Sequence, residues 1–213
     1  MTALNFILTE QEIVVSMDTL ASREDKEPFK FVSKIFPLPH IRTIMCGTGN
    51  LELLLNWHII IQTKIVSRDI EYVDRYATQF LRELDSKYPD ELSATVYHFG
   101  YSEKEDKLKG YAYRKEKQFE SELMVYGIGT KPPLETELVY TIFDNNDNYD
   151  KALIEMMEEQ KRRDDIKTED KVGIGGEIQM CVMNTNFFTI AIVHRFADYE
   201  ETYRKVMANL RAD

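Results

Sequence analysis

Three residues near the start of the chain, Thr2, Asp18 and Lys34, have side chains that could together carry out nucleophilic chemistry. A threonine hydroxyl is a weak nucleophile until a base removes its proton, and the α-amine of an N-terminal threonine can be that base. This amine has a reference pKa of about 7.7–8.0. A nearby lysine lowers that pKa by like-charge repulsion, and an aspartate can orient the lysine. The set requires removal of Met1, which would give Thr2 a free α-amine.

The chain is expected to bring these residues together through blocks of strands and helices. Apolar runs and period-2 patterns predict strands at 3–9, 12–17, a pair within 29–36, 41–46, 93–102, 107–116, 121–129, 177–184 and 187–196. Helical periodicity predicts helices at 51–66, 67–89, 146–163 and 198–210. This order favours an α+β fold in which sheets lie between helical layers over a doubly wound parallel sheet.

The two consecutive helices differ in their patterns. Segment 51–66 is apolar on nearly every side, so we expect it to be buried all round. Segment 67–89 begins with a serine that can cap a helix, and it places Ile70, Val73, Ala77 and Phe80 on one stripe.

Length and composition limit the kind of protein. The 213 residues, 43% of them hydrophobic, are enough for one globular domain covering 1–213. The formal net charge of −10 argues against nucleic acid as a partner, because phosphate contacts need a basic surface. No apolar run reaches membrane-spanning length and no signal peptide opens the chain, so we expect a cytoplasmic protein without membrane partners.

No cofactor or metal site is expected. Cys46 and Cys181 lie in apolar runs and are interpreted as buried thiols, and the four histidines share no ligand spacing. The charged stretch 161–171 is interpreted as solvated loop or helix end.

The opening of the chain resembles the proteasome β-subunit family and its bacterial HslV-type relatives, which are N-terminal-nucleophile (Ntn) hydrolases. In that family an Asp and a Lys follow the catalytic Thr by 16 and 32 residues, as Asp18 and Lys34 follow Thr2. The resemblance implies a four-layer αββα sandwich. It implies that Thr2 is the nucleophile and base, that Lys34 tunes the amine and that Asp18 orients Lys34.

Further residues are assigned through the same resemblance. Ala21 and Ser22, which follow Asp18 in "DTLAS", are implied to face the substrate. The "MCGTGN" segment resembles the family's strand–glycine–helix junction. This implies that the N–H of Gly47 stabilises the oxyanion, with the N–H of Thr48 as the alternative. Thr48 and Gly49 are also implied to contact the substrate. Gly175 and Gly176 resemble the glycine-rich turn that flanks the site.

The chain departs from the family pattern at several positions. The "YGIGT" segment resembles a turn that usually reads Gly-Ser-Gly, so Ile128 stands where a serine is usual. Later in the chain Lys171 and Ile174 stand where an Asp and a Ser are common, and Leu20 replaces an Arg.

The function implied by the resemblance is hydrolysis of a peptide or amide bond through an acyl-enzyme ester. Family members form rings, so a homo-oligomer is expected, and an ATP-dependent unfoldase is a possible partner. Two alternatives stay open at this stage: a catalytically inactive proteasome-like protein that acts as an assembly or binding module, and an amidase for small substrates.

Overall fold

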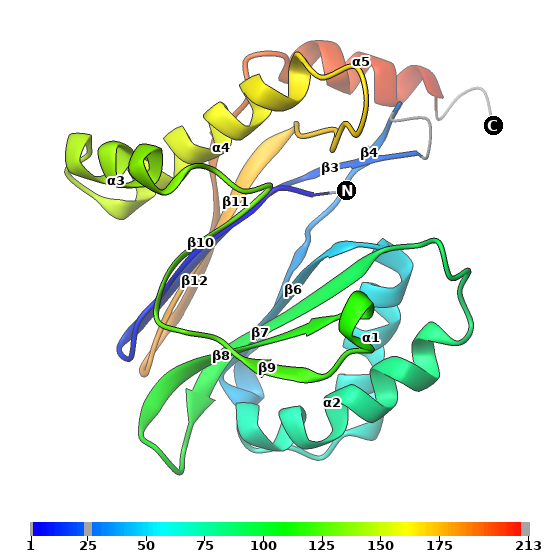
Figure 1. The fold of residues 1–213 in the computed structure, drawn as a ribbon, viewed down its shortest axis with the longest axis vertical. Coiled ribbons are helices and arrows are strands. Elements are labelled where there is room, and N and C mark those ends of the chain that lie inside the picture. Colours follow the sequence, from blue (N-terminus) through cyan, green and yellow to red (C-terminus); the bar gives the residue numbers. More distant parts are fainter. Residues whose placement is uncertain (1, 24–26, 210–213) are drawn as a thin grey trace.

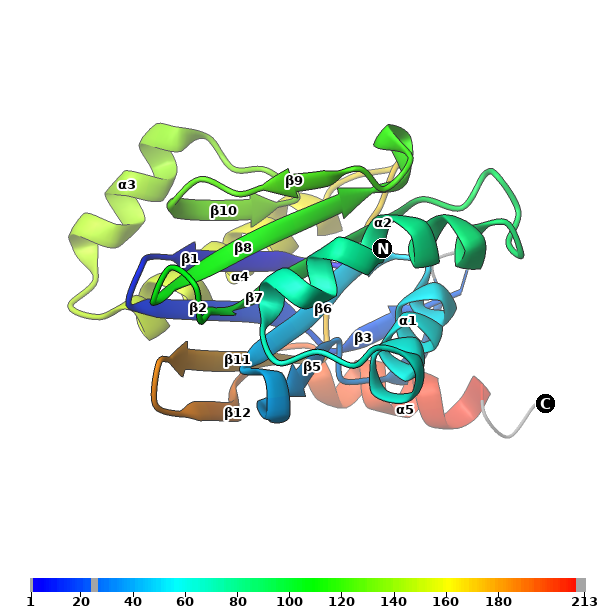
Figure 2. The ribbon, with the colours of Figure 1, turned by 90° about the horizontal axis from the view of Figure 1, so that it is seen from below.

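Two antiparallel five-stranded sheets form the centre of the molecule, and helices cover their outer faces (Figures 1 and 2). The computed structural model describes residues 2–23 and 27–209. The first sheet has the order β10-β1-β2-β11-β12, and the second has the order β5-β6-β7-β8-β9. A separate two-stranded sheet joins β3 to β4.

The strands of the first sheet are β1 (Leu4–Leu8), β2 (Glu12–Asp18), β10 (Gly127–Lys131), β11 (Glu177–Asn184) and β12 (Phe188–Arg195). The strands of the second are β5 (Ile35–Leu38), β6 (Thr43–Gly49), β7 (Ala94–Ser102), β8 (Lys107–Arg114) and β9 (Ser121–Leu123). The small sheet consists of β3 (Leu20–Ser22) and β4 (Pro28–Phe31). The helices are α1 (Leu51–Lys64), α2 (Ile70–Asp85), α3 (Thr136–Asn145), α4 (Tyr149–Asp165) and α5 (Tyr199–Asn209), with single 3₁₀ turns at Pro39–Ile41 and Lys115–Lys117.

Three apolar layers separate the four layers of secondary structure. One lies between α1, α2 and the second sheet and is built around the buried Trp57. A second fills the space between the two sheets and includes Leu4, Val15 and Phe99. A third, with Met156 at its centre, lies between α3, α4 and the first sheet. The four-layer αββα sandwich predicted from the sequence is therefore confirmed.

Several elements differ from the sequence-based predictions. Segment 121–129 was predicted as one strand, but it divides into β9 and β10, which belong to different sheets. Strand β3 and helix α3 were not predicted. Helix α2 begins after Asp69, whose side chain accepts the N–H of Tyr72, so the predicted serine cap is wrong.

Helix α1 is not buried all round. Its inner face is buried, but the exposed fractions of Leu55 and Ile59 are 41% and 53%. Periodicity cannot show which part of an apolar helix remains uncovered when apolar residues occur on every side. In residues 2–23 and 27–209, no helix has both the length and the apolar character needed to cross a membrane.

Candidate active site

The structure brings Thr2, Asp18 and Lys34 together where the two sheets open. Asp18 ends β2 of the first sheet, and Lys34 lies directly before β5 of the second. The exposed fractions of Thr2, Asp18 and Lys34 are 7%, 0% and 3%. Lys34 Nζ lies 3.0 Å from Asp18 Oδ1 and 2.6 Å from the carbonyl oxygen of Leu20, to which it also donates. The N–H of Ala3 donates to the same Asp18 oxygen at 2.9 Å, so Asp18 fixes the main chain directly after Thr2.

The glycine-rich turn predicted to flank the site supports Asp18 from the other side. The N–H of Gly175 points to Asp18 Oδ2 at 3.4 Å, and its carbonyl oxygen accepts the N–H of Leu20 at 3.1 Å. Gly176 has φ +81°, and a Cβ there would lie 2.6 Å from Thr19 Oγ1, so only glycine fits at this position. The turn therefore holds Asp18 and Leu20, which lie on either side of Thr19.

Burial dominates the electrostatics of the Asp18–Lys34 pair. It raises the pKa of Asp18, and the Lys34 ammonium and the N–H groups of Ala3 and Gly175 oppose this rise. It also lowers the pKa of Lys34, against the attraction and hydrogen bond of Asp18. Lys34 therefore releases its proton more easily than a solvated lysine does.

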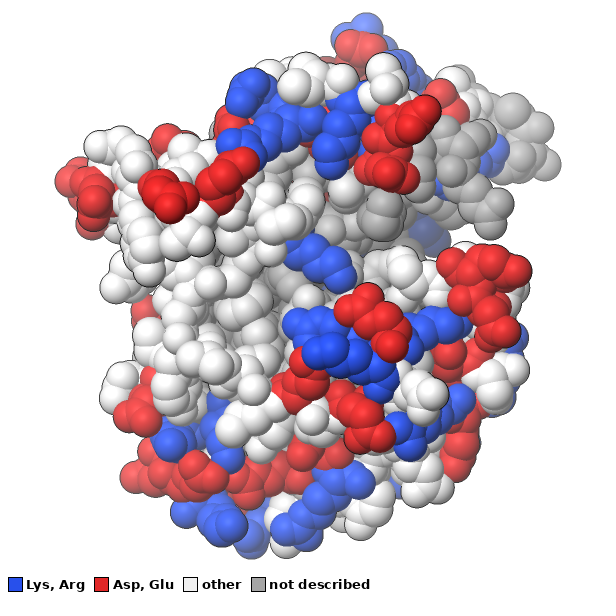
Figure 3. All heavy atoms as spheres, in the orientation of Figure 1, with Lys and Arg blue, Asp and Glu red and all other residues white. Residues whose placement is uncertain are grey.

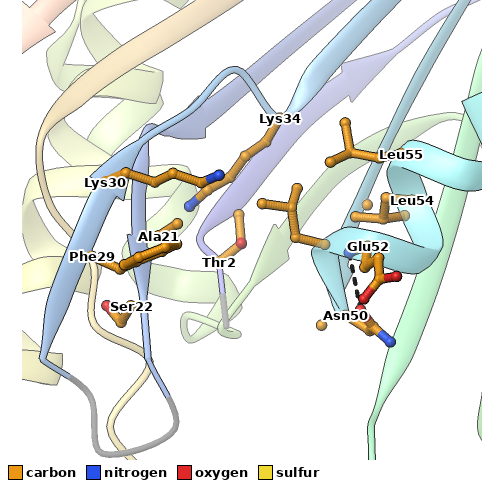
Figure 4. Close-up of a pocket in the computed structure, with 13 residues that line it drawn as sticks. Thr2, Ala21, Ser22, Phe29, Lys30, Lys34, Asn50, Glu52, Leu54 and Leu55 are labelled. Carbon is orange, nitrogen blue, oxygen red and sulfur yellow. Dashed lines mark hydrogen bonds between the residues drawn. The ribbon is translucent and has the colours of Figure 1, made fainter. Parts of the chain in front are cut away.

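A cavity of about 440 Å³ opens beside Thr2 and Lys34. Besides Thr2 and Lys34, four further residues assigned from the sequence line it: Ala21, Ser22, Gly47 and Gly49. Figure 4 shows Thr2 in the middle of this cavity, with Lys34 and Lys30 on one side and Asn50 and Leu54 on the other. The Asn50 side chain accepts hydrogen bonds from the N–H groups of Glu52 and Leu53 and so fixes the start of α1 directly after Gly49, the last residue of β6.

The register of β6 decides which of its N–H groups face this cavity. The bonds from Asn50 N to Ser93 O and from Tyr101 N to Arg42 O assign the even-numbered residues of β6 to hydrogen bonds with β7. The N–H groups of Gly47 and Gly49 therefore point to the opposite side. Strand β5 begins there only at Ile35, the partner of Cys46, and does not extend alongside the two glycines. Between Gly47 and its rival Thr48, the geometry favours Gly47, and it adds Gly49.

Gly47 must also be glycine for reasons of space. A Cβ at this position would lie 2.4 Å from Leu54 Cδ2 and 2.6 Å from the carbonyl oxygen of Thr95. At Gly49, φ is +97° and a Cβ would lie 2.1 Å from the carbonyl oxygen of Ser93. The two glycines thus allow α1 and β7 to approach β6 closely at the cavity.

Thr48 does not line the main cavity. It lines a second cavity of about 190 Å³ that also contacts Thr2 and Gly49. The other lining residues are Ser93, Lys131, Pro132, Pro133 and Val172. Two cavities therefore meet at Thr2 and Gly49.

The structure corrects the assignment of "YGIGT" to a turn beside the nucleophile. Gly127, Ile128 and Gly129 belong to β10 and pair with Leu8, Ile7 and Phe6, at the end of β1 away from Thr2. A Cβ at Gly129 would lie 2.0 Å from the Phe6 ring, so packing and not a turn explains this glycine. Lys131 pairs with Leu4, and the segment 131–133 is what lies beside Thr2. Ile128 therefore does not replace a serine of the site.

Sequence reasoning missed the residue that holds the other side of the site. Asp164, in the stretch interpreted as solvated, is 2% exposed. Its carboxylate accepts the N–H groups of Val172 at 2.7 Å, Gly173 at 2.8 Å and Ile174 at 3.4 Å. It thereby joins α4 to the loop that leads into the turn at Gly175 and Gly176. Nothing in the local sequence separates Asp164 from its exposed charged neighbours.

The remaining sequence assignments concern the cysteines and Met1. Both thiols are free and buried, as predicted, and burial raises the pKa of Cys181 to about 12. Neither thiol has the lowered pKa of a reactive cysteine. Met1, on which the threonine chemistry depends, lies outside the described residues.

The layers and the position of Thr2 define the class of the chain as a proteasome-like Ntn fold. No protein-family model and no curated protein matches the chain. Among solved structures, it is similar to a Gly-1 mutant of Anbu from Hyphomicrobium sp. strain MC1, with a TM-score of 0.65 and 14% identity. It is also similar to Anbu from the same strain, with a TM-score of 0.62 and 12% identity. Each comparison covers 100% of this chain and 94% of the other.

These comparisons correct the family resemblance drawn from the sequence. The assignment to proteasome β-subunits and HslV-type proteins is wrong, because the similar structures are Anbu proteins, a different but related proteasome-like family. At 12–14% identity the similarity shows the fold alone.

Proposed function

We propose that this chain is an Ntn amide hydrolase that uses Thr2 as its nucleophile after removal of Met1. The observation that carries the proposal is the buried Asp18–Lys34 pair, hydrogen-bonded to the main chain next to Thr2 at the wall of a cavity. A buried ion pair is costly to desolvate and is weak evidence for stability alone. Its place beside a potential nucleophile favours a role in chemistry.

The proposed reaction has two steps. Thr2 Oγ1 attacks the amide carbonyl carbon while the α-amine takes the hydroxyl proton, and the N–H groups of Gly47 and Gly49 stabilise the oxyanion. The C–N bond then breaks, the leaving nitrogen takes the proton from the amine, and an ester remains on Thr2. In the second step the same amine deprotonates a water molecule, which attacks the ester carbonyl carbon. The C–O bond to Thr2 then breaks, Thr2 Oγ1 takes the proton back from the amine, and the acid is released.

Lys34 and Asp18 act on this reaction through Thr2. A positive charge on Lys34 lowers the pKa of the nearby amine and keeps a larger fraction of it neutral. Asp18 holds Lys34 in place and fixes the N–H of Ala3, and so the position of Thr2.

The test combines intact-mass measurement with covalent labelling. We expect the mass of the protein from its native host to correspond to loss of Met1, and a β-lactone or epoxyketone to add one equivalent. Thr2→Ala should abolish the label, and Thr2→Ser, which keeps a hydroxyl and an amine, should retain it. Complete retention of Met1, or labelling that survives Thr2→Ala, contradicts the proposal. Retained Met1 would favour the alternative of an inactive assembly or binding module.

We also propose that copies of the chain associate through the two edges of the first sheet. Strand β10 and strand β12 are these edges. Segments 123–130 and 187–193 contain no charged residue, and Val125, Ile128, Ile190 and Ile192 are exposed there. Figure 3 shows the uncharged area over β10, below α3. Proteins usually protect exposed edge strands with charges or a cover, so uncharged edges support contacts between subunits.

A further inference from the structure

Lys131 is a half-buried lysine that the reaction proposed above does not use. It ends β10, and its Nζ lies 3.1 Å from Thr95 Oγ1. Within residues 2–23 and 27–209 it forms no ion pair with a carboxylate, whereas Lys34, Lys109 and Lys161 each contact one. Burial lowers its pKa, the nearby Arg114 adds to this effect, and the Glu116 carboxylate opposes it. Glu116 is therefore near enough to act on the ammonium group, but no carboxylate of the described residues is in direct contact with it.

The surroundings of Lys131 indicate where a negative charge could bind. Lys131 lies between two cavities. One is the cavity of about 190 Å³ that contacts Thr2, and the other, of about 400 Å³, lies on its other side. The latter is lined by Asp90, Glu91 and Glu116, which outnumber Lys131 and Lys115 there and so disfavour an anion. In the cavity of about 190 Å³, Lys131 is the only charged residue among those that line it.

The remaining walls suit a small group with a carboxylate. Pro132, Pro133 and Val172 are apolar, and the hydroxyl-bearing residues Thr48 and Ser93 can add hydrogen bonds. At about 190 Å³ the cavity is less than half the size of the main one, so it suits one side chain or a chain end.

We propose that Lys131 binds a carboxylate of the substrate, so that the preferred substrates carry an acidic side chain or a terminal carboxyl group next to the bond that is cleaved. This inference rests on the proposed function, because it places the carboxylate relative to the carbonyl attacked by Thr2. A charge-assisted hydrogen bond in a partly dry cavity discriminates well against the neutral amide, which has the same shape.

The kinetic test uses matched fluorogenic peptides with Glu or Gln at each of the two positions on either side of the scissile bond. A second set compares a free carboxyl terminus with a carboxamide, which separates a side chain from a chain end as the source. We expect kcat/KM for the acidic member to be about tenfold higher at one position. Lys131→Met should remove this preference by lowering kcat/KM for the acidic member to the level of the amide member, and Lys131→Arg should keep most of it.

Lys115→Met is the matched control, since it removes the same charge from the cavity on the other side of Lys131, where Lys115 pairs with Asp85. It should leave the preference intact. Equal rates for the acidic and amide peptides, or a preference that persists in Lys131→Met, overturn the inference.

A binding experiment separates this inference from the proposed function. If no peptide is cleaved, the acidic peptide and its amide counterpart are titrated into the full chain, and the amide NMR signals of Gly49 and Ser93 are followed. Shifts caused only by the acidic peptide and absent in Lys131→Met support the carboxylate site although the hydrolase fails. Equal shifts for both peptides, or none, overturn the site as well.

Discussion

At the residue scale, the Asp18–Lys34 pair combines a structural and a chemical requirement. Asp18 accepts hydrogen bonds from Lys34 and from the main chain on both sides of the site. Each charge depends on the other, because an uncompensated charge at full burial is far more costly than a paired one. The effects of changing one residue are therefore expected to depend on the state of its partner.

This coupling leads to a stability prediction. Lys34→Met should lower the free energy of unfolding by about 3–5 kcal/mol, because it leaves Asp18 buried without its counter-charge. In the double variant Asp18→Asn, Lys34→Met no charge remains buried, so the loss should be smaller than for Lys34→Met alone. Urea unfolding of the wild type and the variants gives these values. A loss below about 1 kcal/mol for Lys34→Met would show that the pair is not held as ions.

At the element scale, the sequence predicted elements well where one pattern extends over a whole segment. Strands β1, β2, β11 and β12 were predicted because each forms one short apolar run. The resemblance to the family then supplied the αββα layers and the grouping of Thr2, Asp18 and Lys34. The family that it indicated was wrong, because at 12–14% identity the similar structures share the fold alone with this chain.

The failures at this scale have one physical cause, which is contact with distant residues. Position 129 requires glycine because Phe6 packs on it. Asp164 is buried because it accepts hydrogen bonds from the loop before Gly175 and Gly176. Lys131 lies beside Thr2 only because β10 pairs with β1 in one register. None of these contacts leaves a local pattern in the sequence.

The contact between α1 and β7 gives a pH-dependent prediction. Trp57 Nε1 of α1 donates to Nε2 of the fully buried His98 at 2.9 Å, and burial lowers the pKa of His98 to about 3. The unfolded chain binds a proton at His98 below pH 6.5, and the folded chain does not until about pH 3. The free energy of unfolding should therefore fall as the pH falls through this window, by about 1.4 kcal/mol per pH unit from His98.

The control for this prediction is His98→Gln, which keeps an acceptor for Trp57 and does not titrate. Carboxylates contribute to the pH dependence of both proteins, so the comparison isolates the histidine. Denaturant unfolding between pH 7 and pH 4 should give a steeper loss of stability in the wild type. Parallel curves would place His98 in a solvated or already protonated state.

At the scale of the whole molecule, the distribution of charge favours association at particular surfaces. A net charge of −10 makes copies repel one another, so contacts are favoured where acidic residues are absent. The edges at β10 and β12 meet this condition and lie at opposite ends of one sheet. Contact between two different edges is heterologous, and repeated contacts of this kind give a ring if the rotation closes.

Association through these edges can be tested by the mass of the protein in solution. Sedimentation or light scattering should give a mass several times the 25.0 kDa of one chain. Ile192→Lys places a charge on β12, where Ile192 is 47% exposed, and should shift the mass toward one chain. Val66→Lys is the control, because Val66 is 93% exposed but follows α1 and lies on neither edge. A wild type that remains monomeric, or an Ile192→Lys variant that assembles as the wild type does, would exclude the β12 edge as a subunit contact.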